Sequence, residues 1–101
     1  MNKAKVLSDL GLAMRAGKLI LGEESVLEAI KENRARLAFL ASDTGSTTAK
    51  RIQDKSAFHE VQLCREFTTE ELSSAIGKDN RKVIAVTDRN FAILLEKAIN
   101  E

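Results

Sequence analysis

Helix-like and strand-like segments alternate along the whole chain of 101 residues, and this alternation limits the possible folds more than any other feature. Five segments repeat apolar residues every three or four positions, as amphipathic helices do: 3–16, 23–33, 46–56, 68–76 and 88–99. Short apolar runs of strand length separate them, at 19–21, 36–42, 60–64 and 82–87. The pattern predicts an α/β/α sandwich, three layers built around a small central mixed sheet of about four strands.

Residues that favour turns and caps mark the boundaries of these segments. Gly22 permits a tight turn from strand to helix, because glycine adopts positive φ without strain. Thr68-Thr-Glu-Glu71 matches the capping box that begins many helices, and Asp88 is expected to cap the last helix. Ser46 or Thr47 is expected to cap the third helix by the same chemistry.

Composition narrows the class of protein. Hydrophobic residues make up 44% of the chain and proline is absent, so we expect one domain over residues 1–101. Sixteen basic and fifteen acidic residues leave a net charge of +1, which argues against nonspecific capture of nucleic acid but leaves room for a local basic patch. The single cysteine, Cys64, excludes an internal disulfide and a CxxC metal site. No membrane span or signal peptide is visible, so we expect a cytoplasmic protein. We also expect it to bind no metal or cofactor.

Few side chains suggest catalysis. His59 has no second metal ligand nearby in sequence, and Cys64 lies within an apolar strand, so both are expected to be structural. The segment Ser42–Arg51 has hydroxyls and cations that suit a phosphate, but it lacks P-loop spacing and fits a capped helix start better. Three carboxylates at the second helix form either an acid–base pair or a solvated face that complements the helix dipole: Glu23, Glu24 and Glu28.

The basic residues lie near predicted turns. They are Arg15 and Lys18 at the first glycine turn, Lys50 and Arg51 in the third helix, and Lys78, Arg81 and Lys82 after Gly77. Loops from strand to helix tend to gather at one end of a sheet, so the Gly22 turn and the 42–47 loop are expected to lie together. Cations near helix N-termini there would form an anion-binding rim. The alternative is scattered charge that keeps the protein soluble.

Three stretches together resemble the ribosomal L-seven-Ae family of kink-turn RNA-binding proteins, and in particular its short bacterial YlxQ-like members. They are LGLAMRAGKLILGEESVLEAI at 10–30, LAFLASDTGSTTAKRI at 37–52 and LSSAIGKDNRKVIAVTDRNFA at 72–92. The resemblance implies an α/β/α sandwich without enzymatic activity that binds sharply bent RNA and is associated with the ribosome or translation. It implies structured RNA, including ribosomal RNA, and ribosomal proteins as partners, with no membrane.

The resemblance also implies a site at the start of the second helix. Archaeal members of the family read Gly-Ala-Asn-Glu-Val-Thr-Lys, whereas this chain keeps the glycine and differs at the asparagine, glutamate and lysine positions. The implied RNA-contacting residues are Gly22, Glu23, Glu24, Ser25 and Glu28. An ionised Glu24 accepts hydrogen bonds but donates none, and Glu28 is negative where the archaeal pattern is positive.

A second contact region implied by the resemblance follows Gly77, where archaeal members carry an aliphatic-rich turn. Here the turn is polar, and with Lys18 it is expected to support the phosphate backbone through Lys78, Asp79, Asn80, Arg81 and Lys82. Two other functions remain open. The acidic second helix suits a protein-interaction module that has lost strong RNA affinity, and Ser42–Arg51 suits a small nucleotide-binding or hydrolytic protein.

Overall fold

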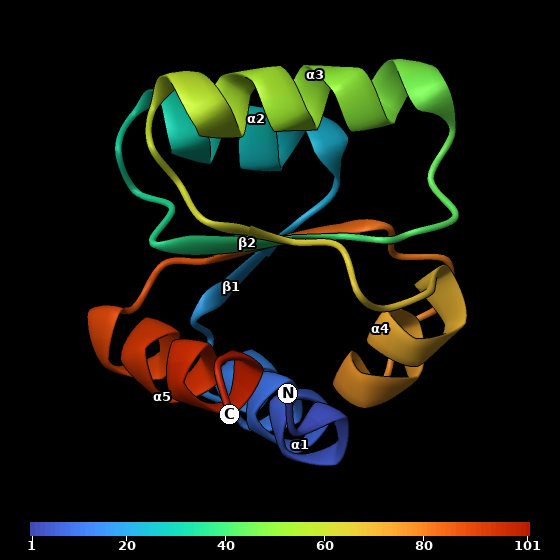
Figure 1. Ribbon diagram of the computed structural model, residues 1–101, viewed down its shortest axis with the longest axis vertical. Coiled ribbons are helices and arrows are strands. Elements are labelled where there is room, and N and C mark those ends of the chain that lie inside the picture. The colour runs from blue at the N-terminus through green and yellow to red at the C-terminus, as the bar shows by residue number, and fades with distance from the viewer.

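The computed structural model describes residues 1–101, which form five helices and four strands (Figure 1). In chain order these are α1 (Lys3–Arg15), β1 (Leu19–Leu21), α2 (Glu23–Lys31), β2 (Leu37–Leu40), α3 (Ser46–Phe58), β3 (Leu63–Cys64), α4 (Thr69–Ile76), β4 (Val83–Val86) and α5 (Arg89–Ile99). The predicted alternation is confirmed. No helix reaches the length and hydropathy that a membrane-spanning segment needs.

The four strands form one mixed sheet between two layers of helices. Helices α2 and α3 cover one face, and α1, α4 and α5 cover the other (Figure 1). The strand order is β1-β4-β2-β3, with β4 antiparallel to both of its neighbours and β3 parallel to β2. Strands β2 and β4 are buried along their whole length, as their continuous apolar runs predict. The predicted three-layer sandwich around a small mixed sheet is confirmed.

The sheet has two ends with different loops. At the α2 end, β1, β2 and β3 finish and lead into α2, α3 and α4, and β4 begins. At the α5 end, β1, β2 and β3 begin, and β4 finishes and leads into α5. The α2 end lies on the right of Figure 1, where the loop from β2 rises to α3 and α4 lies beneath it. The expected gathering of strand-to-helix loops therefore occurs, with the β4–α5 loop as the exception.

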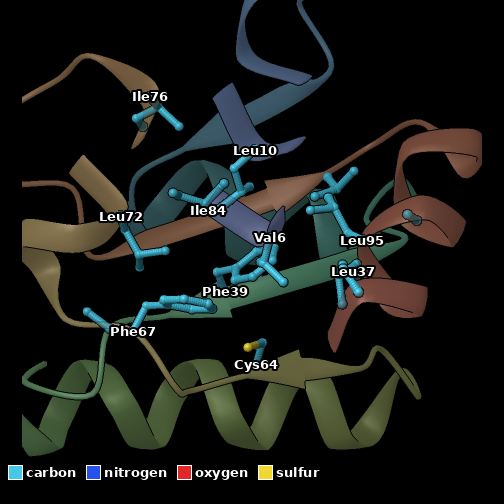
Figure 2. Close-up of a cluster of buried hydrophobic side chains, with 14 residues drawn as sticks. Val6, Leu10, Leu37, Phe39, Cys64, Phe67, Leu72, Ile76, Ile84 and Leu95 are labelled. Carbon is cyan, nitrogen blue, oxygen red and sulfur yellow. The ribbon is translucent and has the colours of Figure 1, made fainter. Parts of the chain in front are cut away.

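The core has a cluster on each side of the sheet. The larger cluster joins α1, α4 and α5 to the sheet, and its aromatic centre is Phe39 against Phe67, with ring centroids 6.3 Å apart (Figure 2). Fully burying one such side chain stabilises a fold by about 1.5–3 kcal/mol. The smaller cluster packs α2 and α3 on the other face, around Ile30 and Ile52. Cys64 belongs to the larger cluster, and burial raises the pKa of its thiol, in keeping with a structural role.

Two predicted boundaries were right and two were wrong. Thr68–Glu71 forms a complete capping box, and Asp88 accepts a hydrogen bond from the Phe91 N–H at 2.9 Å. Neither predicted residue caps α3, because Gly45 occupies the N-cap position in an extended conformation and Ser46 is already helical. The strand predicted at 60–64 is only Leu63–Cys64, because the chain still turns out of α3 at Glu60, which has a φ of 56°.

The Gly22→Ala variant is expected to be destabilised by about 1–3 kcal/mol, because φ 96° and ψ 152° at Gly22 lie in a region that essentially only glycine adopts. The matched control is Gly45→Ala, where φ is −59° and a methyl group meets open space. We expect the control to change stability by less than about 1 kcal/mol. Urea unfolding of both variants measures the difference, and equal stabilities would contradict the assignment of strain to Gly22.

Candidate nucleic-acid interface

The α2 end brings together segments that are far apart in the sequence. The Gly22 N–H donates to the Val83 carbonyl at 3.0 Å, and the Ala41 N–H donates to the Lys82 carbonyl at 2.8 Å. The first residues of β4 are therefore held between the end of β1 and the end of β2. Consequently the start of α2, the loop before α3 and the loop after α4 lie at one end of the molecule (Figure 1).

Helices α2 and α3 both begin at this end without a side-chain cap. Glycine occupies each N-cap position, and the first helical hydrogen bonds run from Val26 to Gly22 and from Ala49 to Gly45. The three N–H groups before each of these bonds have no partner within the protein. Uncapped N–H groups and the positive end of the helix dipole favour an anion such as phosphate. The α2 end therefore presents two anion-attracting helix starts.

The acidic residues at the start of α2 are tied to α3. Arg51 forms ion pairs with Glu23 and, at 3.0 Å, with Glu24, and the Thr48 hydroxyl donates to Glu23 at 2.7 Å. Glu23 is thus a bridge between two helices instead of part of a freely solvated face. The hydrogen bond to Glu24 and the charge of both carboxylates raise the pKa of the Arg51 guanidinium. Because Thr48 and Arg51 serve this bridge, the nucleotide-site hypothesis for Ser42–Arg51 has two of its donors already engaged.

The loop after α4 has a fixed shape. Gly77 ends the helix in the left-handed conformation, and Asn80 also has a positive φ of 52°. The Arg81 N–H donates to Ser73 Oγ at 2.8 Å, and the Ser73 hydroxyl donates to the Arg81 carbonyl at 3.3 Å. Ser73 on α4 thus holds the loop through two hydrogen bonds to the Arg81 backbone, and Lys78 lies on a conformationally constrained turn.

Asp43 joins this loop region to the loop before α3. Its carboxylate accepts hydrogen bonds from the Thr69 hydroxyl at 2.7 Å and from the Thr69 N–H at 2.9 Å, and Lys82 Nζ donates to the same hydroxyl at 3.0 Å. The Thr69 hydroxyl and N–H, followed by the nearby Lys82 charge, lower the pKa of Asp43. A hollow of about 590 Å³ beside this cluster is lined only by polar residues, including Lys78 and Asn80.

The cations at the α2 end differ in how they are held. Lys78, Arg81 and Lys82 form no ion pair, whereas Arg51 has two carboxylate partners. Lys78 is exposed and Arg81 and Lys82 are half-buried. Positive charge that is not already paired remains available to phosphate.

The structure brings together all but one of the expected site residues. Gly22, Glu23, Glu24 and Ser25 begin α2, with Glu28 exposed one turn further on, and the Lys78–Lys82 loop lies at the same end of the sheet. Lys18 is the exception and corrects the sequence-based grouping. It precedes β1 and its carbonyl accepts from the Thr87 N–H, which places it at the α5 end. Lys18 and Gly22 flank β1 and so lie at its opposite ends, but the place of Lys18 relative to the Lys78–Lys82 loop depended on the direction of β1 relative to β4, which the sequence does not show.

Sequence reasoning missed three residues that organise this surface: Asp43, Thr48 and Thr69. Asp43 and Thr69 are 26 positions apart, and Thr48 lies 25 positions from Glu23. Side chains of these types are common in loops and helix starts, so no local pattern pointed to their pairing. Only the three-dimensional arrangement of the strands identifies them.

Comparison with known proteins now adds family membership. Residues 4–95 match the model of the Ribosomal protein L7Ae/L30e/S12e/Gadd45 family. The chain belongs to this family. It is 42% identical over 91 residues to a protein of Enterococcus faecium named RNA-binding protein YlxQ, covering 90% of this chain and 87% of that protein. The resemblance that the sequence suggested is confirmed.

Solved structures show the same fold. One is a protein of unknown function from Bacillus halodurans, with a TM-score of 0.93 and 40% identity over 97% of this chain and 99% of that one. Another is the 15.5 kD RNA binding protein of Giardia lamblia, with a TM-score of 0.84, covering 96% of this chain and 83% of that one. The second shares only 11% of its sequence with this chain, so it demonstrates that the fold tolerates wide divergence.

The Asp43 cluster predicts a pH dependence of stability. The pKa of Asp43 is lower in the folded protein than its ordinary value of 3.8, so ionised Asp43 stabilises the fold above that value. This contribution is lost as the pH falls through the lowered folded pKa. We expect Asp43→Asn to melt below wild type at pH 7, and the difference in Tm to shrink below about pH 3.8. The control is Asp79→Asn, whose carboxylate has no hydrogen-bond partner, and a pH-independent gap for Asp43→Asn would contradict the prediction.

Proposed function

We propose that the chain binds structured RNA of the kink-turn type through the α2 end, and that it acts by binding without catalysis. The observation that carries the proposal is the pair of uncapped helix starts beside unpaired cations on the Lys78–Lys82 loop. Family membership and the RNA-binding name of the Enterococcus faecium relative support the same conclusion. The ribosomal members of the family further support a role in translation, with ribosomal RNA and ribosomal proteins as partners.

The proposed contact begins with the backbone of α2. Gly22 has no side chain to keep RNA away, and the free N–H groups behind it suit phosphate oxygens. Glu24 and Ser25 are exposed in the first turn and can reach base edges, where a carboxylate accepts from amino groups. Proteins read RNA mainly where the helix is distorted and base edges open, and a kink-turn offers such a distortion.

Arg51 offsets part of the negative charge at the start of α2. Two adjacent carboxylates would repel phosphate, but both are paired with one guanidinium that remains nearly half exposed, at 47%. The bridge therefore reduces the net negative charge at the start of α2 and presents a cation beside it. This pairing engages two of the three carboxylates that favoured a protein-interaction module, and Glu28 stays exposed and unpaired. Lys78, Arg81 and Lys82 add positive charge at the neighbouring loop.

The experiment that tests the proposal is a titration of the protein with a kink-turn RNA and with a straight duplex of the same length and composition. We expect tighter binding of the kink-turn, by at least about tenfold, at both low and moderate salt. Three phosphate contacts would give a log–log salt slope of about −2 to −3. Equal affinities that vanish together as salt rises would refute shape-specific recognition. Absence of RNA binding would favour the protein-interaction module instead.

The Glu28→Lys variant is expected to bind kink-turn RNA more tightly than wild type, by about threefold to tenfold. Glu28 is exposed on α2 and forms no ion pair, so the change replaces a repulsive charge with an attractive one. The charge-matched control is Glu96→Lys on α5, which we expect to change affinity by less than twofold. If both variants gained affinity equally, the gain would reflect net charge, and the proposed position of RNA along α2 would be wrong.

A further inference from the structure

The α5 end of the sheet carries a second concentration of positive charge. Five cations lie around the ends of β1, β4 and β2: Arg15, Lys18, Arg34, Arg36 and Arg89. Three carboxylates lie in the chain segments at this end: Glu32, Glu60 and Asp88. Five cations against three carboxylates leave a surplus of two, which exceeds the net charge of +1 for the whole chain. The rest of the surface must therefore be slightly acidic, and the positive potential is concentrated here.

The strand register places the two central cations on either side of Thr87. Leu19 and Leu37 both pair with Val86, so the residues before them, Lys18 and Arg36, both flank Thr87. The Thr87 N–H and hydroxyl donate to the Lys18 carbonyl at 3.0 and 3.1 Å. On the other side the Arg36 N–H donates to the Val86 carbonyl at 2.7 Å. With strands about 4.8 Å apart, Lys18 and Arg36 are roughly 10 Å apart across β4.

Most of these cations form no ion pair within the protein. Lys18, Arg36 and Arg89 are exposed and form no ion pair, whereas Arg34 pairs with Glu32 at 2.9 Å. Asp88 already accepts the Phe91 N–H as the cap of α5. A hollow of about 450 Å³ at this end is lined by Arg34, Arg36 and Thr87 among others, and no carboxylate lines it. Unpaired cationic side chains on a backbone that is held in the sheet favour binding of a polyanion.

We infer that the α5 end is a second RNA-binding surface, one that contacts the phosphate backbone of A-form duplex independently of sequence. The inference rests on the proposed function in taking the polyanion to be RNA. Lys18 and Arg36 supply the central contacts, with Arg89 and Arg15 at the margins. None of these four cations has an exposed aromatic residue beside it in the chain that could stack on bases. The residues therefore favour contact with the phosphate backbone of the RNA.

This surface is separate from the α2 end. The two lie at opposite ends of the sheet strands, and α2 runs between them along one face (Figure 1). The protein measures 28 × 25 × 25 Å, so RNA bound at one end leaves the other accessible to a second duplex segment. The protein would then hold two parts of a folded RNA together: a bent element at the α2 end and a plain helix at the α5 end.

The test is a titration of the full chain with a plain RNA duplex that has no bulge or kink. We expect the Lys18→Gln/Arg36→Gln double variant to bind this duplex about tenfold more weakly than wild type at low salt, with a salt slope shallower by about two. The charge-matched control is Lys55→Gln/Lys97→Gln, on α3 and α5, which is expected to stay within about twofold. Thermal melts confirm folding, and the two single variants resolve each contribution.

Each outcome separates this inference from the proposed function. Unchanged duplex affinity in the folded double variant would overturn the second surface, even if kink-turn RNA still binds at the α2 end. Weakened duplex binding together with no preference for kink-turn RNA would support the second surface and refute the proposed function. Equal losses in the double variant and its control would also overturn the inference, since net charge alone would explain them. Binding to phosphatidylserine vesicles without binding to duplex RNA would assign the surface to lipid and overturn it as well.

Discussion

The antiparallel insertion of β4 between β1 and β2 is the constraint on which the rest of the structure depends. Its hydrogen bonds with both neighbours bury β4 along its full length and hold the two helical layers to one sheet. The same insertion decides which loops meet. Because β4 runs against β1 and β2, the loop before it lies beside the starts of α2 and α3, and Thr87, the residue after it, lies between Lys18 and Arg36. Both candidate surfaces are therefore consequences of one strand's direction.

The electrostatics of the molecule follow from contacts between helices more than from composition. The net charge of +1 does not show that Arg51 offsets one of the two negative charges of Glu23 and Glu24, or that cations outnumber carboxylates at the α5 end. Exposed ion pairs contribute little to stability, typically less than about 1 kcal/mol. Here the ion pairs matter because they change the electrostatic potential at the protein surface. This lower negative charge is consistent with the proposed binding of phosphate near the N-terminus of α2.

Much of the fold could be predicted from the sequence, because apolar periodicity and capping chemistry are local. The helix boundaries at Thr68 and Asp88 and the buried strands β2 and β4 all follow from neighbouring residues. Strand order and direction could not be predicted, because they depend on pairings between residues tens of positions apart. For this reason the sequence alone does not place Lys18 relative to the Lys78–Lys82 loop, and it does not reveal the contact between Asp43 and Thr69. The N-cap of α3 lies one or two residues before the predicted Ser46 or Thr47, because glycine at the N-cap is a weaker signal than serine or threonine.

Amide chemical-shift mapping can show whether the α2 start and the Lys78–Lys82 loop form one RNA-binding surface, as proposed. The measurement is a titration of isotope-labelled protein with kink-turn RNA at moderate salt. We expect the largest shifts to fall on the amides of both 22–28 and 78–82, because RNA would contact both segments at once. Large shifts confined to other parts of the molecule, with both segments unmoved, would contradict it.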